Sequence, residues 1–128
     1  MTAGKVERSS ISWEGNSLET LQGWPKPIRV DFGHSLNLMQ EGQAPQSEVR
    51  PMPSIGSGVF ELKESDDRAW YRVIYLSRIN NVIYVLHCFE KKTRKTERHD
   101  LATAEQRLSE VRARLRLEKR DEKRRHGE

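Results

Sequence analysis

The sequence predicts an α+β domain in which a helical hairpin and a C-terminal helix lie on an antiparallel sheet, in the order β-α-α-β-β-β-α. Two helix-like segments with apolar residues at helical spacing lie in the N-terminal third. Three strand-like segments joined by short turns follow between residues 58 and 89. A long amphipathic stripe closes the chain, and this order of elements is typical of helices packed on one sheet.

The N-terminal third is predicted to contain one weak strand, over residues 6–13, and then two helices. Gly15-Asn16-Ser17 breaks the strand pattern and begins a short first helix. Pro25 and Pro27 suit the first turn of the second helix, where a missing N–H costs little. The apolar face of that helix comprises Ile28, Phe32, Ser35, Leu36 and Met39. Residues 43–57, which contain three prolines, are predicted to be a loop.

The middle of the chain is predicted to form an antiparallel meander. Strand patterns cover residues 58–63, 70–76 and 82–89, and the last of these is the most apolar. Asn80 and Asn81 stand between two β-branched runs, and asparagine tolerates the positive φ of a two-residue hairpin turn. The three strands are therefore expected to be sequential neighbours in the sheet.

The last element is predicted to be a helix from about Asp100 to near Arg124. Its apolar stripe consists of Leu101, Ala104, Leu108, Val111 and Leu115. No apolar residue follows Leu117, so the end of the helix should project from the body or fray. We therefore expect a single domain over residues 1–117 and a charged C-terminal tail over residues 118–128.

Composition excludes several classes of protein. Hydrophobic residues make up 34% of the 128 residues and charged residues 33%, which gives a modest core and a highly charged surface. No apolar run approaches the length of a membrane span, and no signal peptide opens the chain. The single cysteine, Cys88, excludes an internal disulfide and fits a reducing compartment, so a cytoplasmic location is expected. Its position in an apolar strand favours a small buried hydrophobe over a nucleophile.

Positive charge is concentrated in the last third. Residues 1–90 contain 9 Lys/Arg and 11 Asp/Glu, whereas residues 91–128 contain 14 Lys/Arg and 8 Asp/Glu. The second segment opens with a cluster of Lys91, Lys92, Arg94 and Lys95 directly after the most apolar strand. Such a cluster can be a solvated loop, but it also fits an anionic partner, most commonly a polyphosphate backbone.

Two further residues could join this cluster in a site. Arg72 lies in the middle of the central strand, where a guanidinium must be paired, either with a neighbour such as Glu61 or Glu90 or with a bound phosphate. His99 follows the cluster and could act as an acid or base near neutral pH, although a lone surface histidine is as readily structural. No residue spacing indicates a metal site, a phosphate loop or a zinc finger, so no cofactor and no metal are expected.

These segments together resemble a known family. The resemblance rests on Gly56–Leu62, Tyr71–Tyr75 and Ile83–Thr96, and upstream on Asn16–Glu19 and Trp24–Gly42. In this order the segments resemble the phage-derived, HigB-like branch of the RelE/ParE toxin superfamily, over roughly residues 11–117. The RelE-like fold that the resemblance implies has the order of elements derived above.

The resemblance implies a type II toxin that cleaves messenger RNA, typically during translation on the ribosome. It implies neutralisation by a cognate antitoxin, in this branch usually a helix-turn-helix DNA-binding protein. Operator DNA would be bound only through the toxin–antitoxin complex. The reaction would be metal-independent attack of a ribose 2′-hydroxyl on the adjacent phosphate with loss of the 5′-oxygen, which requires positive charge, a base and an acid.

By position, the resemblance assigns catalytic roles to Arg72, Lys92, Lys95 and His99. It assigns RNA or ribosome contacts to the remaining basic residues of the segment, Lys91, Arg94 and Arg98. Relatives often place a tyrosine or histidine near the end of the chain, but no tyrosine follows Tyr84 here. His99 is the candidate for that role.

Two other functions fit the same residues. A toxin of this fold can instead inhibit DNA gyrase, as ParE-like toxins do, because fold does not fix function. A plain nucleic-acid-binding module would explain the basic last third and nothing more. The strand arginine and the lysine cluster favour RNA cleavage, and the missing late tyrosine keeps the gyrase alternative open.

Overall fold

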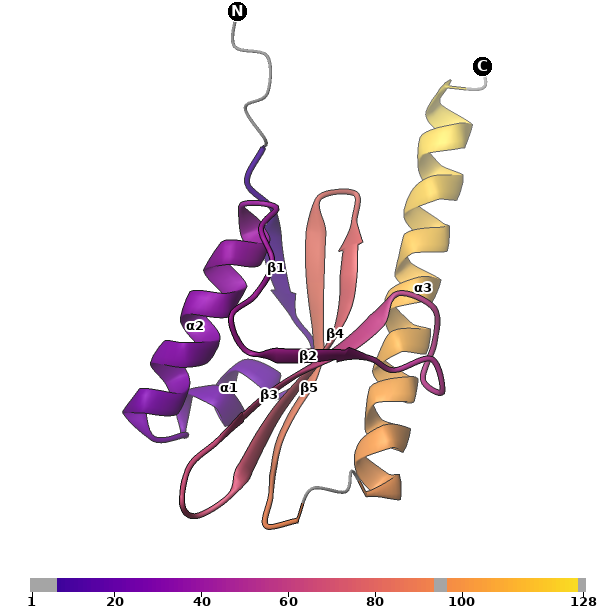
Figure 1. Ribbon diagram of the computed structural model, residues 1–128. Helices are drawn as coiled ribbons and strands as arrows, with labels where there is room; N and C mark the ends of the chain where they lie inside the picture. Colours follow the sequence, from indigo (N-terminus) through magenta and orange to yellow (C-terminus); the bar gives the residue numbers. More distant parts are fainter. Residues whose placement is uncertain (1–6, 94–96, 127–128) are drawn as a thin grey trace, which may run out of the picture.

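The structure is a computed structural model that describes residues 7–93 and 97–126. This part of the chain folds into five strands and three helices (Figure 1). In chain order the elements are β1 (Ser10–Trp13), α1 (Ser17–Gln22), α2 (Lys26–Gln40), β2 (Glu48–Pro51), β3 (Val59–Ser65), β4 (Trp70–Ile79), β5 (Val82–Lys91) and α3 (Arg98–His126). The predicted α+β class is confirmed.

The strands form one mixed sheet rather than the antiparallel sheet that the sequence predicts. Their order is β1-β5-β4-β3-β2. The pairs β2–β3, β3–β4 and β4–β5 are antiparallel, but β1 runs parallel to β5. A long connection permits either direction, and most of the chain lies between β1 and β5, so no tight turn fixes how these two strands pair.

The segment 43–57, predicted to be a loop, contains the strand β2. All four residues of β2 are exposed, and the strand pairs only with β3 at the edge of the sheet. Pro51 is compatible with this position because an edge strand does not need every N–H for the sheet. The prolines that indicated a loop therefore mark an edge strand, and the order of elements is β-α-α-β-β-β-β-α.

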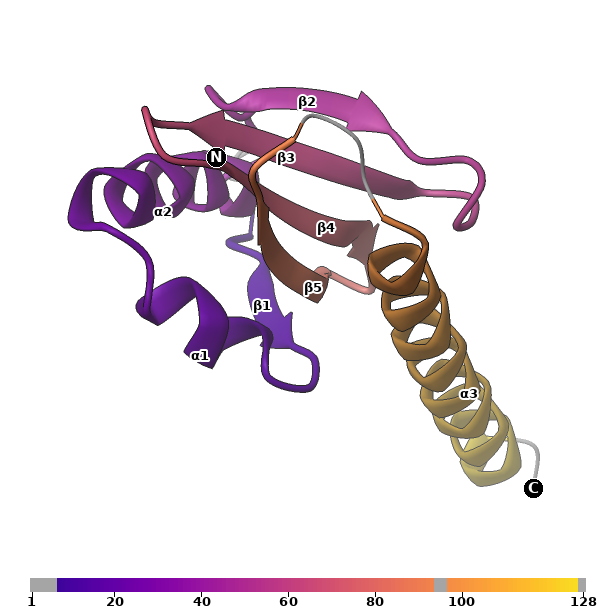
Figure 2. The ribbon, with the colours of Figure 1, turned by 90° about the horizontal axis from the view of Figure 1, so that it is seen from below.

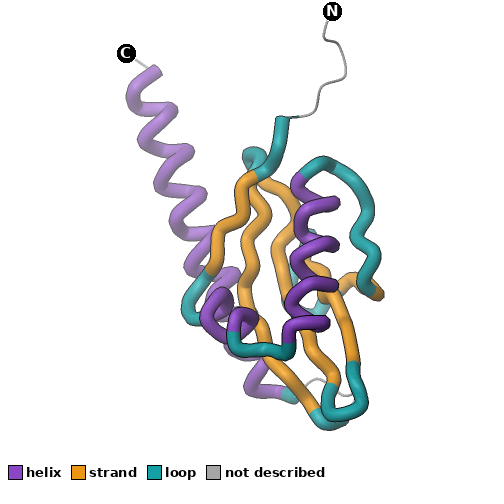
Figure 3. Tube along the Cα trace, turned by 90° about the vertical axis from the view of Figure 1, so that its left-hand side faces the viewer, coloured by secondary structure: helices purple, strands orange, loops and turns teal. Residues whose placement is uncertain are grey.

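The sheet has a helical layer on each face. Figure 3 shows α1 and α2 in front of the strands, and Figure 2 shows α3 on the opposite side of the sheet. The face towards α1 and α2 buries a core that includes Trp24, Phe32, Leu62, Tyr71, Val85 and Cys88. The face towards α3 buries a second core, which includes Ile74, Leu86, Ala104, Leu108 and Val111.

Several local predictions are confirmed. Asn80 and Asn81 have φ values of 51° and 64° and join β4 to β5, as a two-residue hairpin turn requires. Cys88 is buried, and burial raises the pKa of its thiol to about 12, so it behaves as a small hydrophobe. The helix predicted from Asp100 to near Arg124 extends by two residues at each end.

The helix α3 has two different halves. Its first half packs on the sheet, whereas its second half extends beyond the strands (Figures 1 and 2). Leu117, the last apolar residue, is 57% exposed. The division at residue 117 into a domain and a tail stays a prediction, but helical structure is continuous across it.

The two halves of α3 predict different responses to the same substitution. Leu108→Ala should lower the free energy of unfolding by about 2–5 kcal/mol, because it leaves a cavity under a side chain that is only 3% exposed. Leu117→Ala should change it by less than about 0.5 kcal/mol. Urea unfolding followed by circular dichroism measures both values, and equal losses would contradict the packing of α3 on the sheet.

Candidate active site

The sheet face towards α3 is apolar at one end and polar at the other. Leu108 and Val111 of α3 cover Ile74 and Leu86 at the apolar end. At the other end, the same face presents polar and charged side chains from four neighbouring strands: Arg50, Glu61, Lys63, Arg72, His87 and Lys91. Part of this polar end lies beneath the first turn of α3.

Arg72 is completely buried and pairs with Glu61 of the adjacent strand. Its Nη1 lies 3.2 Å from Oε1 and 3.4 Å from Oε2 of Glu61. The Nε of Arg50 donates to the same Oε1 at 3.2 Å. Glu61 is also fully buried, so two guanidinium groups share one buried carboxylate. The pairing with Glu61, which the sequence left open as one alternative, is present.

A β-bulge in β5 directs His87 towards α3. Ile74 pairs with His87 and Tyr75 pairs with Val85, so Leu86 has no partner on β4. The extra residue places both Leu86 and His87 on the α3 side of the sheet, although simple alternation would put them on opposite faces. His87 therefore becomes part of the polar end.

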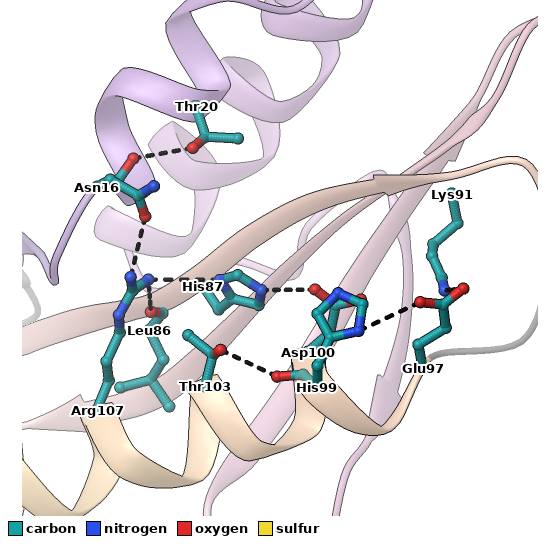
Figure 4. Close-up of polar contacts among 10 residues, drawn as sticks. All are labelled: Asn16, Thr20, Leu86, His87, Lys91, Glu97, His99, Asp100, Thr103 and Arg107. Atoms are coloured by element: carbon teal, nitrogen blue, oxygen red, sulfur yellow. Dashed lines mark hydrogen bonds and ion pairs between the residues drawn. The ribbon is translucent and has the colours of Figure 1, made fainter.

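Both ring nitrogens of His87 have partners (Figure 4). Nε2 lies 2.9 Å from Oδ1 of Asp100, and Nδ1 lies 3.4 Å from Nη1 of Arg107. Arg107 can only donate, so Nδ1 accepts and Nε2 carries the proton to Asp100, which describes a neutral imidazole. Burial lowers the pKa of His87, and this effect outweighs the opposing one of Asp100.

The first turn of α3 surrounds these residues with carboxylates. Glu97 pairs with the Nζ of Lys91, whose side chain is only 7% exposed, and this hydrogen bond lowers the pKa of Glu97. His99 is 73% exposed and lies 3.2 Å from Oε2 of Glu97 and 3.5 Å from Oδ2 of Asp100. The near neighbours of His99 are thus carboxylates, not the cations that its sequence position suggested. We call His87, Lys91, Glu97, His99 and Asp100 the His87 cluster (Figure 4).

Lys92 does not join Arg72. It is exposed and lines a cavity of about 640 Å³ together with Trp24, Arg68, Tyr71, Glu90 and Lys91. Trp24 and Tyr71 belong to the core beneath α1 and α2, so this cavity opens on the side of the sheet opposite Arg72. Arg68, which the sequence analysis did not single out, provides a second exposed cation here.

The basic residues that the sequence predicted to form one site therefore do not all lie together in the described part of the chain. Arg72 and Lys91 are paired with carboxylates, and Lys91 also lines the cavity that contains Lys92, whereas Arg72 does not line it. Arg98 is exposed at the beginning of α3. Arg94 and Lys95, two further predicted site residues, lie outside the described part of the chain. The catalytic and binding roles assigned to all of these residues stay predictions.

Glu97, His99 and Asp100 bring metal-ligating atoms within 4.8 Å of one another. However, Lys91 already neutralises Glu97, and His87 already occupies Asp100. The three residues also lie at the N-terminal end of a helix, where the helix dipole repels a cation and stabilises carboxylates. We therefore interpret Glu97, His99 and Asp100 as a helix N-terminus with paired acids and assign no metal to these residues.

The fold and the polar end define an α+β protein with a charged site at the junction of β5 and α3. The family model described as phage-derived protein Gp49-like (DUF891) matches residues 19–109. The chain therefore belongs to the phage-derived Gp49-like family, a family of type II toxins, and the resemblance to the RelE-like toxin superfamily is confirmed. The HigB-like branch within that superfamily stays a prediction.

Among solved structures, the chain is similar to the isolated RelE toxin of E. coli. The two share 16% sequence identity with a TM-score of 0.46, over 84% of this chain and 98% of that one. A search of curated proteins finds no significant relative. Every helix in the described residues, including the long α3, is too short or too polar to cross a lipid bilayer.

The pair of Glu61 and Arg72 should be strongly coupled. Glu61→Gln should lower the free energy of unfolding by about 3–5 kcal/mol, because it removes the carboxylate that neutralises a buried guanidinium. The double substitution Glu61→Leu with Arg72→Met should cost less than the sum of the two single substitutions. A double-mutant cycle by urea unfolding measures the coupling.

The exposed pair of Glu48 and Lys63 is the control, with its carboxylate 66% exposed. Glu48→Gln should cost less than about 1 kcal/mol. Additive losses at Glu61 and Arg72 would contradict the buried pair.

The neutral state of His87 predicts a dependence of stability on pH. Its pKa is lowered in the folded state, so the unfolded chain binds the proton more readily, and stability should fall as pH decreases below about 6.5. His87→Gln should reduce the loss of unfolding free energy between about pH 7.5 and pH 5.5. His34→Gln, at an exposed position of α2, should leave that loss unchanged. Identical pH profiles for the parent and His87→Gln would refute the assignment.

Proposed function

We propose that this protein is the toxin of a type II toxin–antitoxin system and cleaves messenger RNA on the ribosome in the cytoplasm. The match to the Gp49-like family carries the proposal, because residues 19–109 include every predicted site residue from Arg72 to His99. The partner that neutralises the toxin would be a cognate helix-turn-helix antitoxin. Operator DNA would be contacted only by the complex of the two proteins.

The reaction that we propose is attack of a ribose 2′-hydroxyl on the adjacent phosphate. The oxygen–phosphorus bond to the 5′-oxygen breaks, a base accepts the proton of the 2′-hydroxyl, and an acid protonates the leaving oxygen. Cations must stabilise the negative charge that develops on the phosphate. The exposed residues Lys92, Arg98 and His99 lie on either side of the segment that joins β5 to α3. Among the described residues of this junction, they are the exposed groups that an RNA strand could contact without displacing a carboxylate from Arg72 or Lys91.

The buried cations Arg72 and Lys91 differ from these exposed residues, because each is already paired with a carboxylate. Arg72 is held by Glu61 and Lys91 by Glu97, so each is neutralised by a carboxylate in the structure. A phosphate that contacted either group would have to replace that carboxylate. The pair of Lys91 and Glu97 is the more accessible, since Glu97 is 60% exposed. The catalytic role of Arg72 requires a larger rearrangement, because both members of its pair have no exposed surface.

Expression in cells tests the proposed cleavage. The chain should arrest growth when it is induced without its genomic neighbour, and new transcript 5′ ends should appear only during active translation. His99→Ala should reduce cleavage by about 100-fold or more if the imidazole transfers a proton. Lys92→Ala should also reduce cleavage, through loss of phosphate stabilisation. Mapping of transcript 5′ ends measures both effects.

His34→Ala is the matched control, since His34 is also an exposed helical histidine but lies on α2. Arg72→Ala is a poor test by itself, because it also breaks a buried ion pair. Growth arrest without translation-dependent cuts would reject the proposal. Gyrase-dependent DNA breaks without RNA cuts would select the ParE-like alternative. Salt-sensitive nucleic-acid binding without toxicity would select a plain binding module.

A further inference from the structure

The projecting half of α3 separates its charges by sign around the helix axis. Arg112, Arg116, Arg120 and Arg124 follow one another at intervals of four residues and form a row along one side. Lys119 and Lys123 lie beside this row, three residues after Arg116 and Arg120 respectively. We call these six residues the cationic face of α3. At 1.5 Å per residue, the row from Arg112 to Arg124 is about 18 Å long.

The acids of the same segment lie outside the cationic face. With 3.6 residues per turn, Glu118 is directed away from the cationic face, whereas Asp121 and Glu122 lie at its two edges, three residues from Arg124 and Lys119 respectively. Of the described cations that share their side, Arg114 pairs with Glu14 at 2.7 Å and Arg125 lies four residues after Asp121. No acid therefore lies three or four residues from Arg116 or Arg120, the two arginines at the centre of the cationic face.

The cationic face is unsatisfied within the described residues. Arg112 donates to the carbonyl oxygen of Ser57 at 3.0 Å, which anchors the base of the row to the body. The other five side chains are exposed and make no ion pair with any residue of 7–93 or 97–126. Like charges four residues apart destabilise an isolated helix, so the row opposes helix formation unless an anion binds it.

The chemistry of the face indicates which anion binds. Helices that dock on proteins present apolar anchors at intervals of three and four residues, and the cationic face contains none. Four of its six residues are arginine, whose planar guanidinium donates two parallel hydrogen bonds to a phosphate. A row of evenly spaced charges without apolar anchors matches a repeating phosphate backbone better than a folded protein surface.

We propose that the cationic face of α3 binds the phosphate backbone of RNA. The choice of RNA among polyphosphates rests on the proposed function, whereas the phosphate contact does not. The face belongs to the same helix as His99, and Arg116 lies about 25 Å along the axis from His99. A single RNA molecule bound along α3 could therefore reach the junction of β5 and α3, so that the helix directs RNA towards the candidate site.

The test compares two double variants of the full chain that lose the same net charge. Arg116→Gln with Arg120→Gln removes two members of the cationic face. Val30→Glu with Arg125→Gln is the control, because Val30 is 57% exposed on α2 and Arg125 is on the other side of α3. The probe is a fluorescein-labelled 2′-O-methyl RNA, which lacks the attacking hydroxyl and cannot be cleaved by the proposed reaction. Fluorescence anisotropy over a range of salt concentrations gives the affinity and its salt dependence.

The slope of log affinity against log salt should become less negative by about 1.4 for Arg116→Gln with Arg120→Gln, since each lost phosphate contact on a single strand contributes about 0.7. The control should keep the slope of the parent. The thermal midpoint of the Arg116/Arg120 variant should equal or exceed that of the parent, because two repelling charges are removed. A lower midpoint would show that the row is satisfied within the protein and would overturn the proposal.

Two other results would also overturn it. An unchanged salt slope, or an equal change in the control, would show that no phosphate binds this face. Retained RNA binding together with lost co-purification of the antitoxin would assign the face to an acidic protein segment instead. Because the probe cannot be cleaved, absence of nuclease activity in cells would reject the proposed function and leave the binding result intact.

Discussion

The fold requires helices to cover both faces of a five-stranded sheet, although only 34% of the residues in the chain are hydrophobic. The face beneath α1 and α2 has a continuous apolar core. On the other face, α3 covers only one end with Ala104, Leu108 and Val111. The remaining end carries charged side chains that are wholly or partly out of water, and each of these must be neutralised because an unpaired buried charge is very costly.

That constraint explains why ion pairs gather where the candidate site lies. Glu61 pairs with Arg72 and Glu97 pairs with Lys91, Asp100 accepts a hydrogen bond from the neutral His87, and in each pair at least one member is buried or nearly so. The same arrangement determines what the site can do. Cations suited to a phosphate are present but already paired with carboxylates, so the proposed binding of RNA to them would exchange carboxylate for phosphate. The exposed Lys92, Arg98 and His99 require no such exchange.

The helix α3 connects the parts of the protein that carry function. Its first turn supplies Asp100 and His99, its middle closes the second core, and its projecting end carries the cationic face. Arg107 strengthens this connection, since it donates to the carbonyl of Leu86 and to Asn16 while it faces His87. Because one rigid element contains all these groups, their relative positions are fixed by helix geometry.

Much of the fold can be predicted from short-range sequence patterns, without knowledge of which elements are in contact. The apolar stripe of α3, the helical spacing in α2 and the Asn80–Asn81 turn each specify their own element, because periodicity and turn chemistry act over a few residues. The parallel pairing of β1 and the edge strand β2 were not predictable in this way. The pairing of β1 depends on a partner distant in sequence, and the prolines in and near β2 are equally compatible with a loop.

The sequence by itself determined the family, the charge asymmetry and the requirement that Arg72 be paired. Only the tertiary structure decided that the partner is Glu61, that Lys92 lies on the other side of the sheet and that His87 faces Asp100. The physical reason is that strand register and the bulge at Leu86 set the face of each side chain. One residue of register reverses a face, and residue types along a single strand do not encode that choice.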